Sequence, residues 1–213
     1  MNSTRFTDTV IRQPSKPTSS LPRVVIDLEK LRHINCGLGR FCLYLVRELL
    51  ARPDNFFEPI FFLPDNSEHY FDNITTAHYS NIRVRPWHKE YFQRWLRPIA
   101  RHFHTAPRPA LWHITHQTSK YLPLNNRVPV ILTVHDLNFL HTIDSSCHSG
   151  RIRRHLDHVQ KLVNRAHTIV TDSQFVADDL VRHIDVSSKP IHVIPLGLTK
   201  STTTDTGRPH WVP

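Results

Sequence analysis

Short apolar runs alternate with segments of helical periodicity along most of this 213-residue chain. Continuous runs, such as those within residues 24–26 and 128–134, are typical of parallel strands covered on both faces. The segments between them repeat apolar residues every three or four positions, which indicates amphipathic helices. The alternation predicts right-handed βαβ units and an α/β fold with a doubly wound parallel sheet.

The expected elements follow from these patterns. We expect helices at residues 38–51, 151–166 and 173–183, the last one capped by the hydroxyl of Ser173. Another helical pattern, at 88–104, contains Pro98, which would kink the helix or restart it. Residues 64–81 are polar and indicate a loop or a weak helix. We expect strands at residues 23–28, 59–63, 82–84, 111–114, 129–134, 168–171 and 191–194.

Composition indicates a single folded unit with polar ends. Residues 1–21 are rich in Ser, Thr, Pro and Arg and lack an apolar signal segment, so we expect a disordered leader. Residues 22–197 form the predicted Rossmann-like domain, and residues 198–213 are a Thr-rich tail or the start of a further domain. No apolar run approaches the roughly 18 residues that span a bilayer. The three cysteines show no CxxC pairing, which favours a reduced, cytoplasmic compartment.

The formal charge of +9, with 17 histidines besides, favours an anionic partner. A nucleic acid, a phosphate-bearing small molecule and an anionic membrane surface all fit this charge. The segment 88–104 combines aromatic side chains with arginines, so it fits an interfacial helix on anionic lipid, a nucleic-acid surface, or an ordinary helix covering the sheet. The helix that covers the sheet is slightly favoured. For the interfacial helix, the candidate membrane-binding residues are Arg94, Trp95, Arg97 and Arg101.

Two features mark the predicted carboxyl edge of the sheet. Gly37 and Gly39, two of the five glycines, stand between the first strand and its helix, where an anion can bind backbone N–H groups. The third glycine of a dinucleotide fingerprint is replaced by Cys42, so an anion site and a plain tight turn remain equal alternatives. His135 and Asp136 end a central strand, where His135 can bind a substrate hydroxyl or act as a base and Asp136 can orient it or cap the next segment. The alternative is that His135 and Asp136 have their hydrogen bonds satisfied within the protein and serve a purely structural role.

A polar loop follows the predicted strand at 111–114. Its donors and acceptors suit sugar hydroxyls, and Tyr121 offers a ring that could stack on a pyranose. A zinc site formed by His113, His116 and His135 is conceivable, but chance explains their proximity better in a chain with 17 histidines. We therefore expect no metal.

Taken together, five motifs resemble the N-terminal half of a family 4 glycosyltransferase with the GT-B fold. They lie at residues 37–41, 116–123, 133–140, 171–175 and 193–197. The resemblance extends from about residue 23 to residue 197, and the nearest group is bacterial enzymes of lipopolysaccharide and surface-polysaccharide assembly. It implies retaining transfer of a sugar, without a cofactor, from a nucleotide-sugar donor to a glycolipid or polysaccharide acceptor, with peripheral attachment to the inner membrane as one option.

The resemblance assigns roles by position. Donor phosphate or sugar contacts fall to Gly37, Leu38, Gly39, Arg40 and Ser173, catalytic roles to His135 and Asp136, and acceptor contacts to Asp27, His116, Gln117, Thr118 and Tyr121.

One family feature is absent from the sequence. Family members carry a Glu-x7-Glu pair in a second domain, but no two of the five glutamates here lie eight positions apart. We therefore expect the donor half to be missing, as in a truncated product, a fragment, or half of an enzyme completed by a separate donor-domain polypeptide, and we expect no transfer by this chain alone. A non-catalytic module that binds an anionic glycolipid or another polyanion is the alternative. The net positive charge also fits nucleic-acid binding, but the sequence contains none of the recognised nucleic-acid-binding modules.

Overall fold

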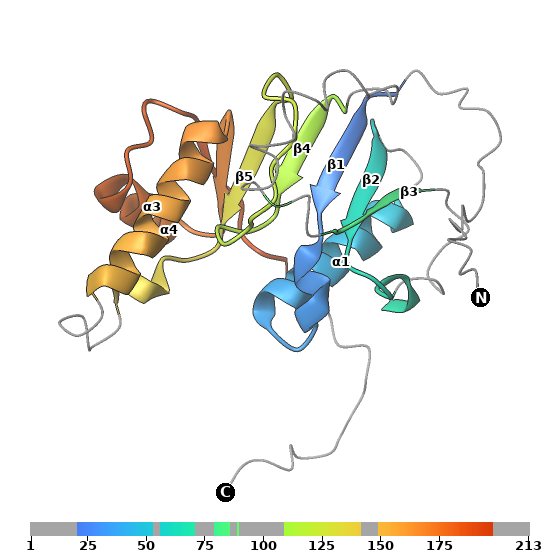
Figure 1. Ribbon diagram of the computed structural model, residues 1–213, viewed down its shortest axis with the longest axis horizontal. Helices are drawn as coiled ribbons and strands as arrows, with labels where there is room; N and C mark the ends of the chain where they lie inside the picture. Colours follow the sequence, from blue (N-terminus) through green and yellow to red (C-terminus); the bar gives the residue numbers. More distant parts are fainter. Residues whose placement is uncertain are drawn as a thin grey trace, which may run out of the picture.

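The computed structural model describes residues 21–52, 56–70, 79–85, 89, 109–141 and 149–197. Within them seven strands form one parallel sheet in the order β3-β2-β1-β4-β5-β6-β7 (Figure 1). The predicted α/β parallel fold is confirmed. The strands are β1 (Arg23–Asp27), β2 (Glu58–Leu63), β3 (Ser80–Arg83), β4 (Leu111–Ile114), β5 (Val130–Val134), β6 (Thr168–Thr171) and β7 (Ile191–Val193).

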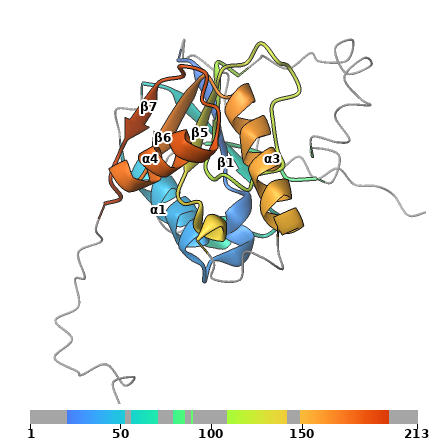
Figure 2. The ribbon, with the colours of Figure 1, turned by 90° about the vertical axis from the view of Figure 1, so that its left-hand side faces the viewer.

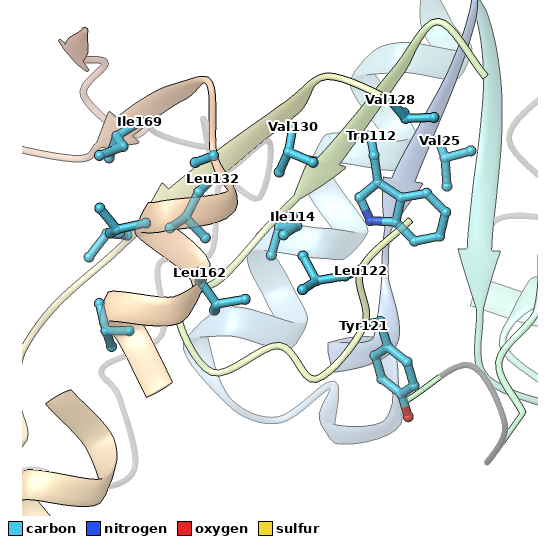
Figure 3. Packing of buried hydrophobic residues seen from close by; sticks show 14 of the residues in the cluster. Val25, Trp112, Ile114, Tyr121, Leu122, Val128, Val130, Leu132, Leu162 and Ile169 are labelled. Carbon is cyan, nitrogen blue, oxygen red and sulfur yellow. The ribbon is translucent and has the colours of Figure 1, made fainter. Parts of the chain in front are cut away.

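Helices cover both faces of this sheet. Figure 2 shows α1 (Gly37–Ala51) and α3 (Ser149–Arg165) on opposite sides of it. One apolar cluster joins α1 to β1 and β2, and a second joins α3 and α4 (Gln174–His183) to the central strands (Figure 3). The sheet is therefore doubly wound, as predicted. Three short 3-10 helices complete the described elements: η1 (Glu29–His33), η2 (Glu68–Tyr70) and η4 (Asn138–Leu140).

The strand β1 explains why continuous apolar runs predicted this sheet. Successive side chains of a strand point to opposite faces, so a strand buried on both faces needs apolar residues in sequence. Val24 and Ile26 lie in the cluster beneath α1, whereas Val25 lies in the cluster on the other face.

The helix α1 begins and ends close to its predicted bounds, but its buried face differs from the predicted repeat. The apolar repeat of Leu38, Phe41, Leu45 and Leu49 indicated the helix; these side chains are half-buried at its flanks. The buried stripe lies one position further along, at Gly39, Cys42, Val46 and Leu50. The sequence did not predict η1 or η4. In contrast, Ser173 caps α4 as predicted, because its hydroxyl accepts a hydrogen bond from the Val176 N–H at 3.3 Å.

Several predictions fall outside the described residues. They concern the leader, apart from its last residue, the segment 88–104, apart from Lys89, and the tail at 198–213. In the part of the chain that the structure describes, no helix is long and apolar enough to cross a membrane.

The first turn of α1 packs tightly against η1. A Cβ added at Gly39 would overlap the backbone carbonyl of His33 and lie 2.9 Å from the Cα of Ile34. A Cβ added at Gly37 would meet nothing within 4 Å. Gly39 is therefore required by the close approach of two backbones, whereas Gly37 is not.

We expect Gly39→Ala to lower the free energy of unfolding by roughly 1–3 kcal/mol, because the methyl group displaces the η1 backbone. Gly37→Ala is the matched control and should change it by less than about 0.5 kcal/mol, because the added methyl group meets open space. Urea unfolding followed by circular dichroism measures both. Equal effects of the two substitutions would contradict the packing role of Gly39.

Candidate functional site

The candidate site lies at the carboxyl edge of the sheet, near the junction of β1 and β4. The chain proceeds outward from β1 through β2 to β3, and then outward in the other direction from β4 through β5 and β6 to β7. Ligands of open α/β sheets bind at the carboxyl ends of the strands where the order reverses in this way. In Figure 1 the arrowheads of β1, β2, β4 and β5 point toward the end of the molecule that carries η1 and the start of α1.

His135, directly after β5, is held at both ends of its ring. Its Nδ1 lies 2.6 Å from the Oδ2 of Asp172, and its Nε2 lies 2.8 Å from the backbone oxygen of Thr115. The ring of Phe41 packs edge-on against the imidazole, with centroids 4.6 Å apart. The first turn of α1 therefore lies beside His135, as expected for two features at the same carboxyl edge of a parallel sheet, and the imidazole is fixed in one orientation.

Asp136 takes one of the two places that the sequence left open. Its carboxylate accepts the N–H of Asn138 at 3.1 Å and so caps the segment that follows, the second of the two options. The carboxylate that orients His135 is that of Asp172. The sequence did not single out Asp172, because this residue lies 37 positions after His135. The two side chains come into contact only when β5 and β6 pair. The catalytic role of Asp136 stays a prediction.

Gln117 joins two loops of the site. Its Oε1 accepts the N–H of His135 at 3.3 Å, and its Nε2 donates to the backbone oxygen of Asp136 at 2.9 Å. Since Gln117 is buried and both ends of its amide are bonded, it positions the loop after β4 against the end of β5. Direct contact between Gln117 and an acceptor stays a prediction.

Asp27 is buried, with 0% of its surface exposed, at the end of β1. Its carboxylate accepts the hydroxyl of Ser119 at 2.5 Å and the N–H of Glu29 at 3.0 Å. Its backbone oxygen accepts the hydroxyl of Thr115 at 2.5 Å. Burial raises the pKa of Asp27 from 3.8 to about 7. The residue lies behind the loop predicted to face an acceptor and holds that loop to β1.

The three histidines considered for zinc bind separate partners. The Nε2 of His113 lies 2.9 Å from the hydroxyl of Thr133, and the Nδ1 of His116 lies 3.0 Å from the hydroxyl of Thr118. Burial lowers the pKa of His113 to about 4 and that of His116 to about 3, so both rings are neutral near pH 7. Among the described residues no group of three or more His, Cys, Asp or Glu side chains could hold a metal ion.

Tyr121 cannot stack on a sugar ring as the sequence suggested. Only 4% of the residue is exposed, and its ring packs against that of Phe62 with centroids 5.2 Å apart. Figure 3 shows its hydroxyl oxygen directed away from the other labelled core side chains. The ring is thus part of the apolar core.

A pocket of about 480 Å³ has Tyr121 in its lining. Thr118 and Tyr121 line it, whereas the other predicted acceptor residues, Asp27, His116 and Gln117, are not among its lining residues. Sequence reasoning missed most of the lining, although basic residues clustered directly after the first strand were a usable signal. The remaining lining residues are Glu29, Lys30, Arg32, His33, Asp65, Val84, Arg85, Lys89 and Lys120.

The predicted donor side is less clearly built. The hydroxyl of Ser173 is engaged as the cap of α4, and the N–H of Gly39 donates to the Sγ of Cys36 at 3.4 Å. Gly37 and Arg40 are exposed in the first turn of α1, and Leu38 between them is half-buried. The Arg40 N–H donates to the backbone oxygen of Cys36 at 3.0 Å, so the N–H groups of Gly37 and Leu38 are the candidates for an anion. Anion binding at this turn stays a prediction. The candidate membrane residues Arg94, Trp95, Arg97 and Arg101 lie outside the described residues.

A parallel sheet of this order, with polar groups gathered at its carboxyl edge, defines a Rossmann-like ligand-binding domain. The family model of Glycosyltransferase Family 4 matches residues 36–201, well over half of the sequence. The chain belongs to this family, and the domain is therefore a glycosyltransferase domain. No curated protein matches the sequence.

Among solved structures, the chain is similar to that of Phytolacca americana UGT2 complexed with UDP-2fluoro-glucose and pterostilbene. The sequence identity is 12% and the TM-score is 0.48. The match covers 85% of this chain and 55% of the other, so this chain spans about half the length of that protein.

The raised pKa of Asp27 makes its contribution to stability depend on pH. Between 3.8 and about 7 the folded state holds a proton on this carboxyl that the unfolded state has lost. Its contribution to the free energy of unfolding is therefore complete at low pH and declines through this window as the pH rises, by on the order of 1 kcal/mol per pH unit. His113 and His116, with lowered pKa values, act in the opposite direction, since their contribution is lost as the pH falls below 6.5.

We expect Asp27→Asn to remove the contribution of this carboxyl alone. The free energy of unfolding of the wild type, minus that of the variant, should decrease as the pH rises from about 4 to about 8, because the variant has no carboxyl to ionise there. Urea unfolding over this range measures the difference, and the histidine contributions cancel in it. Asp157→Asn, on the exposed surface of α3, is the control. A difference between the wild type and Asp27→Asn that stays constant with pH would contradict the raised pKa.

Proposed function

We propose that this domain is the acceptor side of a GT-B glycosyltransferase that transfers a sugar, with retention, from a nucleotide-sugar to a glycolipid or polysaccharide. The observation that carries the proposal is the bonding of residues 115–121. Gln117 binds this loop to the backbone at His135, and Ser119 binds it to Asp27. One rigid segment thus has the pocket on one side and the fixed imidazole on the other, which is the arrangement needed to align an acceptor hydroxyl with a transferring sugar.

In this proposal the donor diphosphate approaches the first turn of α1, where the helix dipole and the N–H groups of Gly37 and Leu38 favour negative charge. His135 contacts the transferring sugar, and Asp172 and Thr115 hold its ring in place. The enzyme acts in the cytoplasm, at the inner face of a bacterial membrane, in the assembly of lipopolysaccharide or another surface polysaccharide. The donor is a co-substrate, and we assign no cofactor.

We further propose that these 213 residues give no transfer when assayed by themselves. The leaving diphosphate needs positive charge placed against it and the family's Glu-x7-Glu segment, and no such segment occurs in these residues. A donor-domain polypeptide would supply them. Release of UDP or GDP from a nucleotide-sugar by the isolated chain, in the presence of an acceptor, would contradict this part of the proposal.

The acceptor role is tested by the binding of labelled protein to an array of neutral and charged bacterial glycans. We expect a defined group of glycans to bind, and Gln117→Ala to weaken that binding about tenfold, because two hydrogen bonds that position the loop are lost. Gln160→Ala is the matched control, since Gln160 makes the same kind of bridge to the backbone N–H and oxygen of Asp185. An array without bound glycans, or equal losses in the two variants, would contradict the acceptor role.

A non-catalytic module for an anionic glycolipid is the second candidate, and the basic lining of the pocket favours it. The salt dependence of binding distinguishes these two candidate functions. Binding that survives high salt and requires the sugar headgroup indicates an acceptor site, whereas binding that high salt abolishes indicates plain electrostatic attraction.

A further inference from the structure

The pocket at the carboxyl edge combines segments from four strands. Glu29, Lys30, Arg32 and His33 lie in η1, after β1, and the segment 118–121 follows β4. Its other walls come from Asp65 after β2, from residues 84–85 after β3, and from Lys89. A volume of about 480 Å³ falls within the roughly 300–1,000 Å³ typical of ligand pockets. The pocket is thus large enough for a small ligand rather than a single ion.

Positive charge is in excess around this pocket. Among the described residues, five lysine or arginine side chains line it against two carboxylates, an excess of three positive charges in this part of the lining. Like charges gathered in one cavity repel each other, and an anion bound among them relieves the repulsion. The five cations are Lys30, Arg32, Arg85, Lys89 and Lys120, and the carboxylates are Glu29 and Asp65.

Both carboxylates are already shared with arginine or lysine. Glu29 lies 3.9 Å from the Nζ of Lys30 and 3.6 Å from the Nε of Arg32. Asp65 lies 3.0 Å from Arg85. These pairs leave the ammonium groups of two further lysines in the lining, Lys89 and Lys120, without a carboxylate partner among the residues that the structure describes.

Backbone contacts hold these two lysines on opposing segments. Lys89 forms an antiparallel β-bridge with Tyr121, the residue that follows Lys120. The loop that carries Lys120 is anchored in turn, because the hydroxyl of Ser119 is bonded to the buried Asp27. The two unpaired charges are therefore presented by a bonded framework rather than by loose surface chains.

Neutral groups of the lining suit the rest of a sugar. Thr118, whose hydroxyl also lies 3.0 Å from the Nδ1 of His116, and Tyr121 line the pocket together with Lys120. Hydroxyl groups donate to and accept from sugar hydroxyls, whereas guanidinium and ammonium groups bind phosphate oxygens through charge-assisted hydrogen bonds. A dianionic phosphate also neutralises three excess positive charges better than a monoanionic carboxylate does.

We propose that this pocket binds a phosphorylated sugar, and that the acceptor of the domain accordingly carries a phosphate group close to the sugar that receives the transfer. The inference rests on the proposed acceptor role and names the chemistry of that acceptor. The phosphate belongs either to a free sugar phosphate or to a phosphorylated sugar headgroup of a lipid. Both sources present the same group to the same cations.

The test measures binding by the full chain without turnover. In one arm, glucose 6-phosphate and glucose are titrated into the protein and followed by calorimetry. In the other, the protein is sedimented with phosphatidylcholine vesicles that contain or lack a phosphatidylinositol phosphate. Both arms use the wild type, the pocket variant Lys89→Gln/Lys120→Gln and the control Lys161→Gln/Arg182→Gln. The control removes the same charge from exposed positions of α3 and α4.

We expect the phosphorylated probe to bind and the unphosphorylated one not to bind. The pocket variant should weaken binding about tenfold or more, and the control less than about twofold, because only the first removes charge-assisted contacts. Binding in the soluble arm identifies a free sugar phosphate as sufficient, and binding in the vesicle arm alone identifies a lipid headgroup. Equal losses in both variants, equal binding of glucose, or no binding in either arm would overturn the inference.

Failure of this inference is distinguishable from failure of the acceptor role. The glycan array with Gln117→Ala includes neutral glycans and does not depend on phosphate. Glycan binding without sugar-phosphate binding would reject the phosphate pocket and retain the acceptor role, and the opposite result would reject the acceptor role.

Discussion

The site depends on one buried carboxyl, that of Asp27. Moving a carboxylate out of water is costly. Hydrogen bonds from the Ser119 hydroxyl and the Glu29 N–H offset part of that cost, and burial still raises the pKa of this carboxyl to about 7. Through these bonds the end of β1 holds both η1 and the loop after β4. Thr115 completes the junction, because its hydroxyl binds the backbone oxygen of Asp27 and lies 3.6 Å from the buried thiol of Cys42.

From this junction the loop extends in two directions with different chemistry. On one side, Thr115 and Gln117 fix the backbone and ring of His135 against Asp172. On the other, Thr118, Lys120 and Tyr121 face a basic pocket. Because one short segment makes both walls, a ligand in the pocket and a group bound at His135 would be held in a constant relation. Such fixed positioning is what transfer between two bound substrates requires.

Local patterns predicted most of the fold and less of the site. The strands and the helices α1, α3 and α4 follow from apolar runs and periodicity, and Ser173 follows from the preferences of helix caps. The sequence identified the motifs around Gly39 and His135, but it did not predict the residues that contact them. A glycine is needed at position 39 because the backbone of His33 and Ile34 lies so close to it. The ring of Tyr121 is buried because it packs against Phe62. Both depend on packing between segments, which no spacing in the sequence records.

The sequence by itself determined a parallel α/β domain of Glycosyltransferase Family 4, because hydrophobic period and motif order are local properties of the chain. The tertiary structure alone decided which charged side chains meet. Asp172 reaches His135 because β5 pairs with β6, and Lys30 joins Lys120 in one pocket because β1 pairs with β4. Strand order brings residues distant in sequence to a common edge, and burial there then sets their charge.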